Sequence, residues 1–152
     1  MNGKIYSRKS MEELLKDNVL DNTAVISFYD PPSERNPNVD KPVDYTEKCD
    51  RVFSVGIHDI DFEVLGDYGL TYDTYFPEAE KLAEFIYKAK QDGLDIICQC
   101  EYGQSRSAAC AAAILEHFYG TGISVFVDYR YYPNQVVYHK VFDALENKSI
   151  NN

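Results

Sequence analysis

The chain has 152 residues, of which 45% are apolar and 26% charged. This length and balance are typical of one globular domain, here residues 1–152, and argue against wholesale disorder. Acidic residues outnumber basic ones by 25 to 15, and the net charge of −10 argues against binding to nucleic acid or an anionic membrane through charge. The sequence shows neither an apolar run of membrane-spanning length nor a secretion signal, so we expect a cytoplasmic protein.

The first third of the chain predicts a helix, a strand and a loop. Ser10 and Glu13 have the spacing of a capping box, which predicts a short helix over about residues 11–18. The apolar and β-branched run at 23–29 predicts a strand, which the following Asp-Pro-Pro sequence ends. The next segment, 33–42, is rich in proline, asparagine and charge and therefore predicts a loop.

Strands and helices alternate through the rest of the chain. We predict strands over 51–57 and 94–99, a long acidic and aromatic loop over 58–75, and helices over 77–91, 105–119 and 134–146. The helix at 105–119 is apolar on nearly all sides, which places it in the centre of the domain. The alternation predicts an α/β fold with a mainly parallel central sheet flanked by helices.

The segment that carries chemistry runs from Cys100 to Ser107, between a predicted strand and the predicted central helix. A turn in this position directs backbone N–H groups into one concavity, where the helix N-terminus adds its positive dipole end. Gly103 lets the backbone approach a bound oxyanion, and Arg106 supplies a charged fork that can hold two of its oxygens. The same positive potential favours a thiolate at Cys100, which is an in-line nucleophile beside a phosphate ester.

This Cys-x5-Arg-Ser pattern resembles the signature of the cysteine-dependent tyrosine and dual-specificity phosphatases, especially their small bacterial members. The resemblance is strongest over 94–119 and extends more weakly from about 23 to 145, including the sequence YPNQVVY at 132–138. It implies a strand–phosphate loop–helix unit and a phosphocysteine intermediate on Cys100. It also implies that Arg106 binds the phosphoryl oxygens and that Ser107 stabilises the thiolate. The N–H groups of the phosphate cradle would come from Glu101, Tyr102, Gly103, Gln104, Ser105 and Arg106.

The reaction also requires an acid that protonates the leaving oxygen. In the resembling family this acid is an aspartate on a loop upstream of the nucleophile. Asp59 fits best, because it follows the strand predicted at 51–57. Asp61 is nearly as plausible, and Asp67 and Asp73 in the same loop stay open because geometry, and not spacing, decides a general acid.

Two residues depart from the family pattern. The residue before the nucleophile is usually His, whereas this chain has Gln99, which forms hydrogen bonds but carries no charge. This substitution leaves open an enzyme of weak activity or a protein that binds phosphoesters without turnover. Tyr102 stands where the family usually has a small residue, and it can either stack on an aromatic substrate ring or pack against residues 62–75.

The remaining cysteines and the histidines have simpler interpretations. Free cysteine is among the most buried residue types, so we predict that Cys98 is buried in its strand rather than paired with Cys100, and that Cys110 packs in the core. The three histidines do not have the spacing of zinc ligands. We therefore expect neither a metal ion nor another cofactor.

The leading hypothesis is hydrolysis of phosphomonoesters, either a phosphotyrosine-containing protein or a small phosphomonoester, with dual specificity left open. The alternative is a weakly active or inactive module that binds phosphoproteins. The late position of Cys100 disfavours the low-molecular-weight phosphatases and arsenate reductases, whose cysteine lies near the N-terminus. Phosphoinositides and RNA 5′-phosphates fit poorly, because residues 101–105 contain a glutamate and neither Lys nor Arg. The sequence makes no prediction of the oligomeric state.

Overall fold

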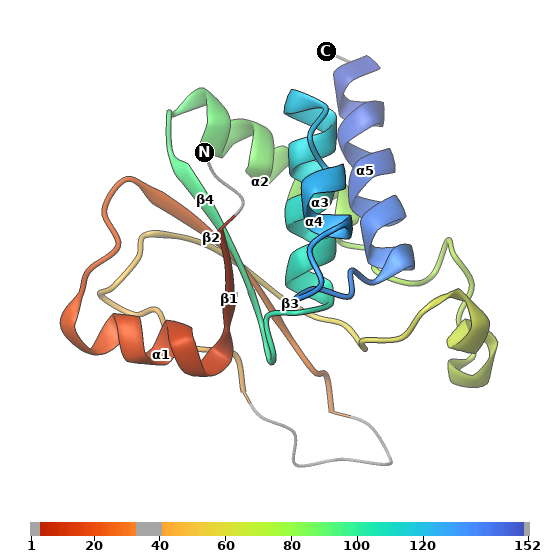
Figure 1. The fold of residues 1–152 in the computed structure, drawn as a ribbon, viewed down its shortest axis with the longest axis horizontal. Helices are drawn as coiled ribbons and strands as arrows, with labels where there is room; N and C mark the ends of the chain where they lie inside the picture. The colour runs from red at the N-terminus through yellow and green to blue at the C-terminus, as the bar shows by residue number, and fades with distance from the viewer. Residues whose placement is uncertain (1–3, 33–40, 151–152) are drawn as a thin grey trace.

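The computed structural model describes residues 4–32 and 41–150 (Figure 1). Its centre is a sheet of four strands in the order β1 (Lys4–Ser7), β4 (Asp95–Cys100), β2 (Thr23–Tyr29) and β3 (Arg51–Gly56). Each pair of neighbouring strands in this sheet is parallel, which confirms the predicted α/β fold with a parallel sheet. None of the described helices has the length and apolar composition of a membrane-spanning segment.

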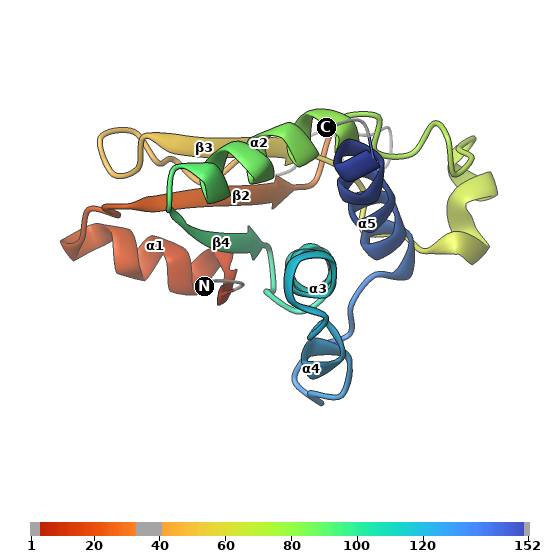
Figure 2. The same ribbon diagram turned by 90° about the horizontal axis from the view of Figure 1, so that it is seen from above.

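Helices cover both faces of the sheet. Alternate residues of β2 point to opposite faces, and each set packs against the helices on its own side. Ala24, Ile26 and Phe28 face the main core, to which α2 (Ala79–Gln91), α3 (Arg106–Tyr119) and α5 (Gln135–Ile150) contribute. Val25 faces the other side, where α1 (Arg8–Asp17) packs. Figures 1 and 2 show α1 on one side of the sheet and α3 and α5 on the other.

The position of α3 follows from its small residues. Residues 106–114 of this helix are buried, and most of them are alanine, so α3 fits closely between the sheet and α5. This confirms the prediction of a central helix. Gly120, in the left-handed conformation with φ of 69°, ends α3, and the short helix α4 (Ile123–Phe126) follows.

The N-terminal part differs from its prediction. β1 was not predicted, because it is a short and partly exposed edge strand whose sequence carries no apolar alternation. The helix α1 begins at Arg8, earlier than predicted, and the predicted capping box at Ser10 and Glu13 is wrong. The cap is Ser7, whose side chain accepts a hydrogen bond from the Ser10 backbone, while the Ser10 hydroxyl accepts one from the Ser7 backbone.

Elsewhere the predicted elements are confirmed to within a few residues at their ends. The segment predicted as a loop at 58–75 contains a 3-10 helix, η1 (Phe62–Tyr68), which Asp61 caps. The short α4 was not predicted either. Most of the loop predicted at 33–42 lies outside the described residues. Because all strands are parallel, the carboxyl ends of β2, β3 and β4 lie at one edge of the sheet, and the candidate site is built there.

Candidate active site

Cys100 is the last residue of β4, and the chain reaches α3 through the turn at 101–105. The side chain of Cys100 is buried, and its Sγ lies 3.1 Å from the Oγ of Ser107, which is also buried. At this distance the serine hydroxyl can donate a hydrogen bond to a thiolate, which stabilises the charged form of the sulfur. The structure therefore places the two residues in the contact that the resemblance implies.

The turn at 101–105 is held by its carbonyl groups. Its carbonyl oxygens accept backbone hydrogen bonds from neighbouring segments: Glu101 from Arg8 (3.0 Å), Gln104 from Tyr132 (2.8 Å) and Ser105 from Asn134 (3.2 Å). In a planar trans peptide the C=O and the following N–H point in opposite directions. The N–H groups that follow these carbonyls are therefore directed away from the anchoring segments.

The backbone at Gly103 lies so close to the backbone of Ser7 that a side chain at position 103 would not fit. Its φ is +68°, and a Cβ atom at this position would lie 2.7 Å from the backbone nitrogen of Ser7. Sequence reasoning assigned the need for glycine to a bound oxyanion, but the structure shows that the backbone at the junction of β1 and α1 imposes it. The unpredicted strand β1 thus supports the candidate phosphate loop.

Arg106 is buried at the start of α3, with a relative exposure of 3%. Its Nη1 donates to Asp30 Oδ1 and to the carbonyl oxygen of Ile57, both at 2.8 Å. Its Nε is buried and has no hydrogen-bond partner within the described residues. One side of the guanidinium is thus fixed by the scaffold, while a buried donor on the other side is available to an anion.

The N-terminus of α3 presents further donors at the same place. Ser105 is the N-cap residue, but its side chain makes no capping hydrogen bond to the helix. It donates instead to Asp59 Oδ1, at 2.7 Å. A helix N-terminus without a side-chain cap, next to a buried arginine, is suited to a tetrahedral oxyanion.

The structure distinguishes among the candidate acids. Asp59 contacts the loop through Ser105 and also accepts from Nδ2 of Asn134, at 3.0 Å. The carboxylate of Asp61 accepts instead from backbone N–H groups of η1 and of the first turn of α5. Asp67 and Asp73 are exposed. Of the candidate acids, Asp59 is thus the one whose side chain is shown to contact the candidate phosphate loop, whereas Asp61 caps two helices.

Asn134 is a site residue that sequence reasoning did not single out. Its side chain lies between Asp59 and the first turn of α5, where its Oδ1 accepts from the Val137 backbone at 2.9 Å. Asparagine is a preferred N-cap residue and Asn134 is the first residue of the helix predicted at 134–146, so the sequence did contain a signal for its structural role. Its contact with Asp59, 75 residues earlier in the chain, had no such signal.

Gln99 is buried in a neutral hydrogen-bond network beneath the loop. Its Nε2 donates to the carbonyl oxygen of Cys100 at 3.0 Å, and its Oε1 accepts from Ser27 Oγ at 2.5 Å and from Tyr45 Oη at 2.9 Å. Burial raises the pKa of Tyr45 above its usual value, so this phenol stays a donor at neutral pH. Gln99 therefore holds the backbone of the nucleophile without carrying charge.

The other residues singled out from the sequence lie around this centre. The Tyr102 side chain is 78% exposed and lines a groove of about 770 Å³ with residues of α1, including Arg8 and Lys9, rather than packing against residues 62–75. Cys98 and Cys110 are fully buried, as predicted. Burial and the neighbouring Cys98 raise the pKa of the Cys110 thiol well above its usual value, so Cys110 is a poor nucleophile.

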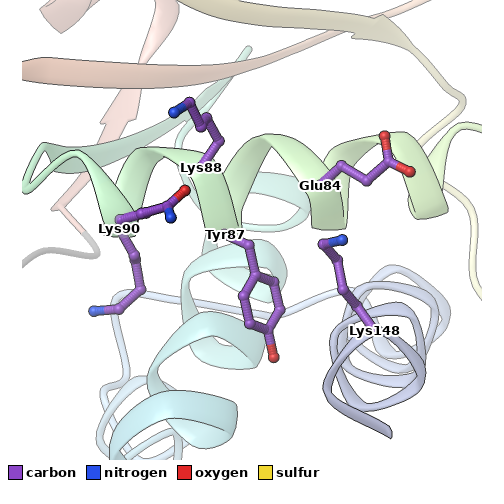
Figure 3. A pocket seen from close by; sticks show the side chains of 6 residues that line it. Glu84, Tyr87, Lys88, Lys90 and Lys148 are labelled. Atoms are coloured by element: carbon purple, nitrogen blue, oxygen red, sulfur yellow. The ribbon is translucent and has the colours of Figure 1, made fainter. Parts of the chain in front are cut away.

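A second groove, of about 780 Å³, lies between α2 and α5 (Figure 3). Its lining includes Tyr87, Lys88 and Lys90 from α2 and Lys148 from α5, and it contains neither a cysteine nor a histidine. Within residues 4–32 and 41–150, no three His, Cys, Asp or Glu side chains are grouped so that they could hold a metal ion. The turn after β4 is therefore the best candidate for a catalytic site.

Comparison with known proteins bears on the fold. No protein-family model and no curated protein sequence matches the chain. Several solved structures do match it. A human tyrosine phosphatase-like serine/threonine/tyrosine-interacting protein aligns with a TM-score of 0.54 and 19% identity, and the alignment covers 95% of this chain and 86% of that one. Human DUSP28 aligns with a TM-score of 0.53 and 16% identity over 98% of this chain and 94% of its own. PTPMT1 in complex with PI(5)P aligns with a TM-score of 0.52 and 13% identity, over 93% and 86%.

The chain has the fold of the tyrosine and dual-specificity phosphatases. The strand and the helix that the resemblance implies on either side of a phosphate loop are present as β4 and α3, with residues 101–105 between them.

Proposed function

We propose that the protein is a cysteine-dependent phosphoric monoester hydrolase of the protein tyrosine phosphatase type. The observation that carries the proposal is the buried guanidinium of Arg106, whose Nε has no partner within the described residues. Arg106 is the first residue of α3 and directly follows the turn that leads from Cys100. Although Nη1 is paired with the Asp30 carboxylate, the buried Nε–H lacks an acceptor, which is costly, and a phosphoryl oxygen matches its geometry.

The proposed reaction has two steps. In the first, the Cys100 thiolate attacks phosphorus, the bond from phosphorus to the ester oxygen breaks, and Asp59 gives its proton to the departing oxygen. In the second, water attacks the phosphocysteine, Asp59 accepts a proton from this water, and the thiolate departs. The Ser107 hydroxyl, 3.1 Å from the sulfur, stabilises the thiolate in both steps.

The proposed substrate is a phosphotyrosine-containing protein or a small phosphomonoester. PTPMT1, a structural neighbour, was solved in complex with a phosphoinositide. In this chain, however, the loop contains Glu101 and neither Lys nor Arg from 101 to 105, on a chain of net charge −10. A substrate with one phosphate is therefore favoured over a polyanionic lipid headgroup or an RNA end, because each additional negative charge is repelled.

The proposal is tested with purified protein and an aryl phosphate in the presence of a chelator. We expect metal-independent hydrolysis that vanadate inhibits and that Cys100→Ser abolishes. Cys49→Ser, at a half-buried cysteine on the other side of the sheet, is the matched control and should keep the rate. Full activity of Cys100→Ser would refute the proposal.

The second candidate is a phosphoprotein-binding module without turnover, which the uncharged Gln99 beneath the loop favours. One structural neighbour carries the name of a phosphatase-like interacting protein. This candidate predicts phosphopeptide binding in calorimetry, loss of that binding in Arg106→Ala, and no release of phosphate. Release of phosphate that depends on Cys100 would exclude it.

A further inference from the structure

The segment that carries Asp59 is hydrogen-bonded at each of its residues. The carbonyl oxygen of Ile57 accepts from Arg106 at 2.8 Å, and that of His58 accepts from Tyr75 Oη at 2.6 Å. Asn134 contacts the next two residues, and the first turn of α5 binds the carboxylate of Asp61. Residues 57–61, which we call the acid segment, are thus attached to three other parts of the chain.

Asn134 is the residue that joins this segment to the rest of the site. Its side chain is buried, with a relative exposure of 4%. Nδ2 donates to Asp59 Oδ1 at 3.0 Å and to the carbonyl oxygen of Ile60 at 2.7 Å, while Oδ1 caps α5. Its backbone N–H donates to the carbonyl oxygen of Ser105 in the phosphate loop. A single residue therefore sets the distance between the acid segment, the phosphate loop and α5.

The two donors on Asp59 determine where its proton lies. Ser105 Oγ and Asn134 Nδ2 both donate to Oδ1. A carboxylic acid that accepts hydrogen bonds on one oxygen carries its proton on the other, so the proton to be delivered lies on Oδ2. Because both donors are fixed by the loop and by α5, the direction of Oδ2 is fixed as well.

We infer that Asn134 is a positioning residue for the general acid, an inference that rests on the proposed function. Asn134 touches neither the phosphoryl group nor the leaving group; it orients the carboxyl group that delivers the proton. Loss of its Nδ2 donor frees the Asp59 side chain to rotate, and a misplaced acid protonates the leaving oxygen less often.

The leaving group of the substrate reports this role. An ester of a weakly acidic phenol, such as phenyl phosphate, needs a proton from the enzyme when the bond breaks, whereas 2,4-dinitrophenolate departs without one. Asn134→Ser keeps an oxygen at a preferred N-cap position, but its side chain is shorter and lacks the amide that donates to both Asp59 and Ile60. We expect kcat/KM for phenyl phosphate to fall about 10²-fold, and kcat/KM for 2,4-dinitrophenyl phosphate to change less than about threefold.

Two further variants make the test decisive. Gln135→Ala alters the neighbouring exposed residue, whose side-chain amide donates to the Pro133 carbonyl and not to the acid segment, and should leave both substrates unaffected. Asn134→Thr also keeps a hydroxyl oxygen that can cap α5 and also lacks the amide, so it should show the same difference between substrates if Asn134→Ser fails to fold.

An equal loss of kcat/KM on both substrates, in a variant with an unchanged thermal midpoint, would overturn the inference and leave the proposed function intact. Absence of Cys100-dependent turnover in the unmodified protein would instead overturn the proposed function, and the inference with it. A selective loss on phenyl phosphate, absent in Gln135→Ala, is the result that we expect.

Discussion

Replacing Gln99 by leucine tests the network beneath the candidate nucleophile. Leucine has a similar volume and is apolar, so the substitution removes three hydrogen bonds without leaving a large cavity. The groups that lose a partner are the Ser27 hydroxyl, the Tyr45 hydroxyl and the Cys100 carbonyl. All three belong to buried residues, so water cannot easily replace the lost amide.

The expected loss of stability follows from how many of these groups stay unsatisfied. The hydroxyls of Tyr45 and Ser27 also interact with each other, so one of them can be satisfied after the substitution. One hydroxyl and one carbonyl then remain buried without a hydrogen bond. Each such group costs about 1.5 kcal/mol, which gives a loss of about 3 kcal/mol in the free energy of unfolding. For a chain of this length, that loss lowers the thermal midpoint by about 6–12 °C.

Urea unfolding followed by circular dichroism measures this loss, since the chain contains no tryptophan to serve as a fluorescence probe. The double variant Gln99→Leu/Tyr45→Phe should lose less than the sum of the single variants, because removing the Tyr45 hydroxyl also removes an unsatisfied group. Gln99→His keeps one donor and one acceptor, so it should be more stable than Gln99→Leu. The network does not hold the loop if Gln99→Leu is as stable as the unmodified protein. The same conclusion follows if the stability losses of Gln99→Leu and Tyr45→Phe simply add in the double variant.

Three further predictions concern the loop, the buried phenols and the surface charge. Gly103→Ala should destabilise the protein by at least about 1–2 kcal/mol, because φ is +68° and the new Cβ would meet the Ser7 nitrogen at 2.7 Å; an unchanged urea midpoint would contradict this. Burial raises the pKa of Tyr45 and Tyr75, so the folded state keeps their protons while the unfolded chain loses them near pH 10. The stability from these phenols is therefore complete below about pH 10 and lost above it, which unfolding midpoints on either side of that pH would show. Strongly acidic phosphopeptides should be poor substrates whose kcat/KM rises with salt; a preference for them at low salt would show that the surface near Cys100 is basic.

The local features of the site were predictable because short stretches of sequence encode them. The strand before Cys100, the turn and the buried helix after it are recognisable from apolar periodicity and from the spacing of Cys100, Arg106 and Ser107. The contact between Cys100 and Ser107 spans only seven residues, and the geometry of a strand-to-helix turn brings them together. The exposed edge strand β1 was missed because its four residues show no apolar pattern, although it supports the loop at Gly103.

The sequence by itself determined the alternation of the longer strands and helices from residue 23 onward, the central position of α3 and the segment that is suited to an oxyanion. Only the tertiary structure decided which aspartate lies beside that segment, because Asp59 and Asp61 are nearly equivalent in spacing but differ in their partners from α5 and the loop. It also decided what holds Arg106 and Gln99, whose partners, apart from the adjacent Cys100 carbonyl, lie between 49 and 76 residues away along the chain. Such contacts depend on how parallel strands bring their carboxyl ends to one edge of the sheet, and no local pattern records which loops meet there.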